Sequence, residues 1–210
     1  MKKIYFILGL LVLTSLCFAQ ERPRWIDFPL SARANYDADR SGAASVWYFD
    51  VGMSQRIASE STARTRAREN VQHSVAANIG TQITSRMDIT NTSFSQASGV
   101  EDVDTLMNEV ITRTIRTRVP GYEPLEWFIE RGTQDGRAYF VAFVLIRIPR
   151  SEIITIIENI NPEVIASEFF RQAGVLQENQ FIEYKADIIQ NFTNSKNTVV
   201  YNIINVLGSN

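Results

Sequence analysis

The strongest constraint on the fold is a column of small and aliphatic side chains that recurs at every fourth residue. It comprises Ala63, Ala67, Val71, Val75, Ile79, Ile83 and Met87. This spacing is close to one helical turn, so the column forms a slowly drifting stripe on a long helix. Arg64 and Arg68 share one side of that helix, and Arg66 lies far around it. We expect the column to pack on a sheet and the arginines to face water, because divergent arginines form no ridge for nucleic acid.

Strand patterns lie before and after this helix. From Val46 to Ser54 apolar residues alternate, and Gly52 is expected to mark the exit of the strand. Later, Asp135-Gly136 supplies a turn between an alternating segment at 125–129 and a β-rich return strand at 137–148. The return strand is apolar on both sides, which predicts a central position in the sheet with cover on both faces. The C-terminal segment is the candidate for the second cover.

A second helical pattern runs over residues 101–119. Carboxylates crowd its start and arginines its end, which complements the helix dipole, and Pro120-Gly121 stops it. The two helices are therefore expected to form a hairpin. In the tail, Asn161-Pro162 is a cap followed by a first-turn proline, and the helix that it starts ends near Gly174. Residues 180–192 follow as a helix, and residues 197–207 fit helix and strand patterns, with helix preferred.

These patterns together predict an α+β fold. It consists of a small antiparallel sheet, made of one strand plus a β-hairpin, packed against a long two-helix hairpin, with a helical C-terminal extension. The predicted divisions are an extended N-terminal arm at residues 20–44, an α+β domain at 45–155 and the C-terminal extension at 156–210. Trp25 and Phe28 in the arm are apolar, so they either pin the arm to the domain, which ordinary burial preferences favour, or contact a partner.

The first 19 residues have the layout of a secretory signal peptide. Lys2 and Lys3 precede an apolar run that is too short to span a bilayer. Cleavage after Ala19 leaves a chain without cysteine, and so without a disulfide or a thiolate nucleophile. The competing interpretation is lipidation of Cys17 in a bacterial lipoprotein, but Leu16 is bulky where a small residue is usual. We expect an exported protein, periplasmic or associated with the outer membrane, that contacts the membrane only if Cys17 is lipidated.

The charge of the chain argues against nucleic acid as a partner. The chain has 21 basic and 23 acidic side chains, and removal of Lys2 and Lys3 makes the mature protein more acidic. Phosphate contacts need clustered positive charge. The sequence therefore predicts protein partners, either other envelope proteins or further copies of the chain itself.

Candidate catalytic and metal-binding residues are sparse. His73 lies off the buried column with no nucleophile beside it in the sequence, so a hydrolase would need a pocket that brings His73 or Glu126 to one. Asp50, Glu126 and Glu130 lie on or beside strands, where carboxylates are usually solvated. The segment from Asp37 to Gly42 matches half a calcium loop, but Tyr48 stands at the twelfth position instead of glutamate. We predict no enzyme activity, no catalytic residues, no cofactor and no metal.

Four segments together resemble a known family. They are "RPRWIDFP", "DVGMS", "ASESTARTRARENVQHSVAANI" and "AYFVAFVLIRIPR". The combination resembles the Lpp-twenty-type family of bacterial envelope lipoproteins, related to the N-terminal domain of the flagellar assembly protein T. The likeness covers residues 22–155, and its most specific elements are the junction at Gly52 and the series Ala63, Arg64, Ala67 and Arg68. It implies a small α+β domain that acts through contacts and has no catalytic residues.

Two functional hypotheses follow. The first is an exported, non-enzymatic cell-envelope protein that acts through protein–protein contacts, as an accessory of outer-membrane or surface-structure assembly. The alternative is a periplasmic binding module for a small apolar or lipid ligand, held between the helical hairpin and the sheet. The aromatic content of the strands motivates the alternative, although core packing accounts for it equally well.

Overall fold

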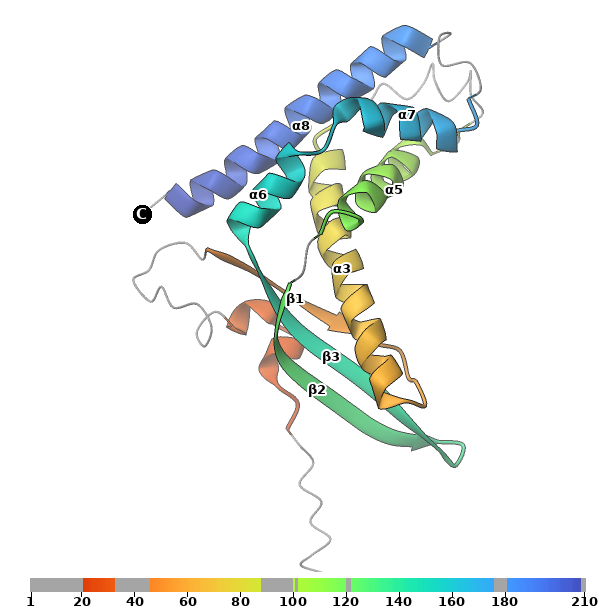
Figure 1. Cartoon of the computed structure of the whole chain (residues 1–210), viewed down its shortest axis with the longest axis vertical. Coiled ribbons are helices and arrows are strands. Elements are labelled where there is room, and N and C mark those ends of the chain that lie inside the picture. Colours follow the sequence, from red (N-terminus) through yellow and green to blue (C-terminus); the bar gives the residue numbers. More distant parts are fainter. Residues whose placement is uncertain are drawn as a thin grey trace, which may run out of the picture.

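The computed structural model describes residues 21–32, 46–87, 100, 102–119, 122–175 and 181–208. The predicted signal peptide at 1–19, Cys17 and the calcium-like segment from Asp37 lie outside these ranges. The helices are α3 (Glu60–Thr84), α5 (Val103–Arg116), α6 (Arg150–Glu158), α7 (Pro162–Gln172) and α8 (Ile182–Gly208). The strands are β1 (Trp47–Met53), β2 (Glu123–Gln134) and β3 (Arg137–Pro149), and two 3₁₀ turns precede them, η1 (Arg24–Ile26) and η2 (Pro29–Ala32). The predicted α+β fold is confirmed (Figure 1).

The sheet is antiparallel with the order β1-β3-β2, so β3 is central as predicted. Its two faces are both buried. Ala142, Val144, Ile146 and Ile148 belong to the core under the helices, whereas Val141, Phe143 and Leu145 belong to a second cluster with Trp25, Ile26 and Ala32. The second cover is therefore the N-terminal segment. The expectation that the C-terminal tail would cover this face is wrong, because the tail helices bury their apolar sides on the helical layer instead.

Helix α3 lies on the sheet through the fourfold-spaced column. Each member from Ala63 to Ile83 is buried, as predicted, whereas the last member, Met87, lies beyond the end of α3 and is only partly buried. The side chain of Ser59 caps the start of the helix. Gly52 does not end β1, which continues to Met53. A methyl group at Gly52 would overlap the carbonyl oxygen of Ala67 and lie 2.7 Å from the Val71 Cβ. Glycine is needed there because the backbones of β1 and α3 approach so closely.

In its described part the C-terminal extension consists of helices and short connections. Asn161 caps α7 and Pro162 occupies its first turn, as predicted, and Gly174 follows its end with φ +73°. Residues 182–208 form one continuous helix rather than two segments. Phe169, Phe170 and Phe192 are fully buried in the same cluster as the α3 column. Residues on both sides of position 155 therefore share one hydrophobic core.

One buried cation holds α8 to the end of α6. The Lys196 Nζ donates to the carbonyl oxygens of Glu158 at 3.2 Å and Ile160 at 2.9 Å. Glu158 is the last residue of α6 and Ile160 lies two residues beyond it, so the ammonium caps the carbonyl end of the helix, where a cation also complements the negative end of the helix dipole. Burial lowers the pKa of the Lys196 ammonium. Among the helices that the structure describes, none combines the length and the hydropathy needed to cross a bilayer.

The described part of the N-terminal arm, residues 21–32, differs from the extended segment that the sequence predicts. Over residues 24–32 the chain winds into η1 and η2, and the Nε1 of Trp25 donates to the Glu126 carboxylate at 2.7 Å. Two prolines and several small residues leave this segment without a helical or alternating pattern of apolar residues, so the sequence gives no sign of the turns. The short turns form where the apolar side chains pack against the sheet.

Candidate functional site

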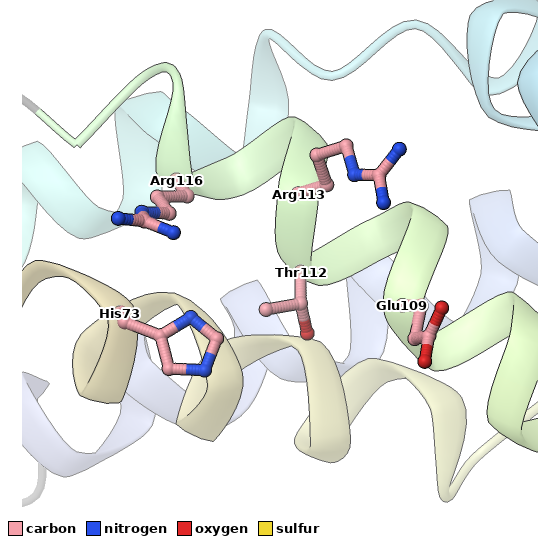
Figure 2. A pocket seen from close by; sticks show the side chains of 5 residues that line it. All are labelled: His73, Glu109, Thr112, Arg113 and Arg116. Carbon is pink, nitrogen blue, oxygen red and sulfur yellow. The ribbon is translucent and has the colours of Figure 1, made fainter. Parts of the chain in front are cut away.

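A polar hollow of about 310 Å³ lies between α3 and α5 (Figure 2). His73 of α3 lines it together with four residues of α5, namely Glu109, Thr112, Arg113 and Arg116. The four are spaced three, one and three residues apart, which places them on one face of α5. His73 is exposed at the rim, in agreement with its position off the buried column. Sequence reasoning singled out His73 but not the α5 residues, whose polar spacing is typical of any solvated helix face.

The hollow has no catalytic arrangement among its described residues. Figure 2 shows the guanidinium groups of Arg113 and Arg116 directed toward opposite ends. Thr112 is 8% exposed, and its Oγ1, which has no hydrogen-bond partner among the described residues, lies against Gly80 of α3, where a methyl group would be 2.5 Å away. A nucleophile needs a base within hydrogen-bonding reach, and no hydrogen bond joins Thr112 to His73. The mixed charges and open rim are those of a polar surface groove.

A partly buried polar network joins β1 to α3. The Ser74 hydroxyl donates to the Asp50 carboxylate at 3.0 Å, and the backbone N–H of Val51 donates to it at 2.8 Å. The Tyr48 hydroxyl also reaches Asp50, at 3.4 Å, and accepts from the Asn78 amide at 3.1 Å. The sequence patterns do not predict this network, although Tyr48 and Asp50 alternate with Gly52 on the face that α3 covers.

Burial shifts the pKa values of two groups in this network, Asp50 and Tyr48. Loss of solvent raises the pKa of the Asp50 carboxyl above its ordinary value, and the hydrogen bonds from Val51, Ser74 and Tyr48 oppose that shift. Burial also raises the pKa of Tyr48 to about 12. The hollows beside His73, Thr81 and Gln55 are lined by other residues, so the network serves to hold β1 against α3.

The three strand carboxylates do not form a catalytic pair. Asp50 faces the helices, whereas Glu126 and Glu130 lie on the opposite face of the sheet. There Glu126 accepts from Trp25, and Glu130 lies 3.6 Å from the Arg22 guanidinium. Across the described ranges, no three His, Cys, Asp or Glu side chains are grouped so that they could hold a metal ion.

The arginines of α3 do not simply face water, as the sequence suggested. Arg64 and Arg68 lie over the ring of Trp127 in β2, at 4.9 and 5.3 Å from its centroid. Arg66 diverges, as expected, and pairs with Glu69 at 2.7 Å. Aromatic faces attract guanidinium groups, so Arg64 and Arg68 tie the helix to the hairpin while their polar edges stay accessible.

The two apolar side chains predicted to pin the arm or to contact a partner have different surroundings. Trp25 is 6% exposed and packs in the cluster beneath the sheet. Phe28 is 62% exposed, with the Arg24 guanidinium 5.9 Å from its ring centroid. The same segment therefore both anchors itself and presents an apolar surface.

The space between the helices and the sheet is filled by side chains. The aliphatic column of α3 and the β3 residues beneath it are buried in one cluster. Two further hollows among the described residues, of about 400 and 310 Å³, lie on polar surface, one beside Thr81 and Asn108 and one beside Gln55 and Asn70. No observation in this part of the chain therefore favours an apolar ligand between the helical hairpin and the sheet.

Comparison of the chain with protein-family models, with curated proteins and with solved structures found no match. The resemblance to the Lpp-twenty-type family therefore rests on the residues of this sequence alone.

Proposed function

We propose that this chain is an exported, non-enzymatic cell-envelope protein that acts through contacts with other proteins. Its place would be that of an accessory in outer-membrane or surface-structure assembly. The leader at residues 1–19 and the family resemblance support the compartment. The observation that carries the contact role is the exposure of Phe28 and Leu30, each 62% exposed.

The exposure of these two residues follows from how the arm is held. Trp25 and Ile26 on one side and Ala32 on the other are buried against the sheet. The segment 25–32 is therefore anchored at both of its ends, and Phe28 and Leu30 between the anchors are exposed. Large apolar groups that an anchored segment directs into water are favourable contact points for a partner, because covering them removes apolar surface from solvent.

Site-specific photocrosslinking tests this role. A photoreactive phenylalanine analogue at Phe28, in the cells that produce the protein, should give a discrete crosslinked product. Tyr201 on α8, 63% exposed, is the matched control because it is equally accessible on another surface. The proposal fails if position 28 gives no product, or the same products as position 201.

Intact-mass analysis of the exported protein tests the compartment separately. Cleavage after Ala19 leaves Gln20 as the first residue, whereas lipidation leaves an acylated Cys17. Either product supports export, and they differ by the mass of the acyl groups and three residues. A chain that retains residues 1–19 inside the cell would contradict the proposal.

A further inference from the structure

The outer edge of β2 is a long strand edge with no described strand paired to it. The strand is twelve residues long and pairs on one side only, with β3. Figure 1 shows it along the border of the sheet, and no other described strand lies beyond it. Long unpaired edges are places where a further strand can be added.

The ladder defines which backbone groups point outward. On β3 the backbone of Ala142 bonds to Ser54, on the β1 side, so alternation in the antiparallel ladder directs Val141 and Phe143 toward β2. Their partners in β2 are Glu130 and Phe128. The residues between and beyond these partners therefore direct their N–H and C=O groups away from the sheet: Trp127, Ile129, Arg131 and Thr133.

By contrast, the other edge of the sheet, along β1, is blocked to an added strand. On β1 the outward N–H of Val51 is bonded to the Asp50 carboxylate, and the outward carbonyl of Met53 accepts from the Asn70 amide at 2.7 Å. Side chains thus occupy backbone groups that an added strand would need. No comparable side-chain bond to the four outward residues of β2 is present among the described residues, so β2 is the edge that remains open.

Positive charge lines the helix side of the open edge. Arg131, whose side chain is 70% exposed, pairs with Glu60 at 3.0 Å, and Arg64 pairs with the same carboxylate. Arg68 has no carboxylate partner among the described residues. Two of these three guanidinium groups therefore share one carboxylate and the third has none, along the side where alternate side chains of an added strand would lie.

We propose that the outer edge of β2 binds an extended segment of a partner protein as a fourth strand, with carboxylates on alternate residues beside Arg64, Arg68 and Arg131. This inference rests on the proposed contact function and names the partner's chemistry. Main-chain hydrogen bonds supply the affinity, and the guanidinium groups select acidic side chains.

A second copy of the chain is a poorer occupant. Antiparallel pairing of two β2 edges places both helical layers on the same face of the joined sheet. The arginines of the two copies would then face each other, with only two Glu60 carboxylates among six guanidinium groups. Like charges brought together in this way oppose association. Charge complementarity therefore favours an acidic segment.

Two labelled octapeptides test the inference with the mature chain. One alternates Thr and Glu, and the other alternates Thr and Gln, so they differ in charge but share the same backbone hydrogen-bonding groups. The Thr-Glu peptide should bind about fivefold to tenfold more tightly at low salt, and the difference should shrink as salt is added. Fluorescence anisotropy gives both affinities. Hydrogen exchange should show new protection at the amides of 127, 129, 131 and 133.

Variants of the protein locate the peptide. Thr133→Pro removes one outward N–H, which an edge strand tolerates, and should weaken both peptides, whereas Thr133→Val keeps the N–H and should not. Arg68→Gln should reduce the preference for the Thr-Glu peptide. Arg66→Gln is its control, because Arg66 belongs to the same helix but pairs with Glu69 away from the edge.

Peptide methylation tests the main-chain bonds directly. If the added strand is antiparallel, N-methylation of the Glu amides abolishes binding and N-methylation of the Thr amides does not; a parallel strand gives the reverse. Either pattern supports strand addition. The inference is overturned if neither peptide binds, if Thr133→Pro has no effect, or if the mature chain forms a dimer that Thr133→Pro dissociates. A partner crosslinked at Phe28 would still support the proposed function in each of these cases.

Discussion

The two faces of the sheet are covered in different ways. The helix face lies under α3, and the cluster there has members from Ala63 in α3 to Val200 in α8. The opposite face is covered by a segment of about a dozen residues, which contributes Trp25, Ile26 and Ala32 to a cluster of eight buried side chains. We therefore expect a substitution on the helix face to destabilise most of the chain. A substitution on the arm face can be relieved by local detachment of the N-terminal segment.

The largest effect is expected from Phe169→Ala on the helix face. Phe169 is fully buried on α7, with its ring 5.8 Å from that of Phe170. The cavity should lower the free energy of unfolding by about 3–5 kcal/mol. Chemical denaturation measures it, and Val164→Ala on the same helix, where Val164 is 48% exposed, should cost less than about 1 kcal/mol. A small effect at Phe169 would mean that α7 does not share the core.

Gly52→Ala should have the next largest effect, about 2–3 kcal/mol, through overpacking instead of a cavity. The added methyl group meets the Ala67 carbonyl and the Val71 side chain, so β1 and α3 must separate. Thermal unfolding compares it with Met53→Ala at the neighbouring exposed position, which should be nearly neutral. Equal stability of the two variants would show that β1 and α3 are not closely packed.

Trp25→Ala tests the arm face. It should lower the free energy of unfolding by about 1–2 kcal/mol, less than the two changes above, because the arm can detach instead of leaving a rigid cavity. Its clearest sign should be local. Trypsin should cleave at Arg24 faster than in the parent protein, while cleavage within α3 stays slow. Phe28→Ala leaves the anchors intact and serves as the control. Global unfolding in Trp25→Ala would make the two faces energetically equivalent.

The smallest effect is the pH dependence contributed by Asp50. Its pKa is raised in the folded protein by burial, so the folded state binds more protons than the unfolded chain above the ordinary carboxyl pKa. Stability contributed by this group is complete below that value and is lost as pH rises through the folded pKa. Denaturation of the parent and of Asp50→Asn over pH 4 to 7 should show a relative loss in the parent as pH rises. A relative gain would reverse the sign and point to a stabilised carboxylate.

Local patterns explain why much of the helix face could be predicted. The column of α3, the Asn161-Pro162 start of α7 and the Asp135-Gly136 turn each depend on neighbours within one or two turns of the chain. These three features could therefore be predicted from the sequence. The candidate site could not be predicted in this way. The hollow beside His73 combines residues of α3 and α5, and the Asp50 network combines β1 and α3, so both depend on how separate elements meet.

The sequence by itself determined the fold class, the buried stripe and the central position of β3, because hydrophobic periodicity and turn chemistry act over short distances. Only the tertiary structure decided which segment covers the second face of the sheet, why residue 52 has to be glycine, and where the arginines of α3 lie. Each of these depends on contacts between residues far apart in the chain, such as Trp25 with Glu126 and Arg64 with Trp127. Such contacts are selected by the packing of whole helices and strands and not by a local sequence pattern.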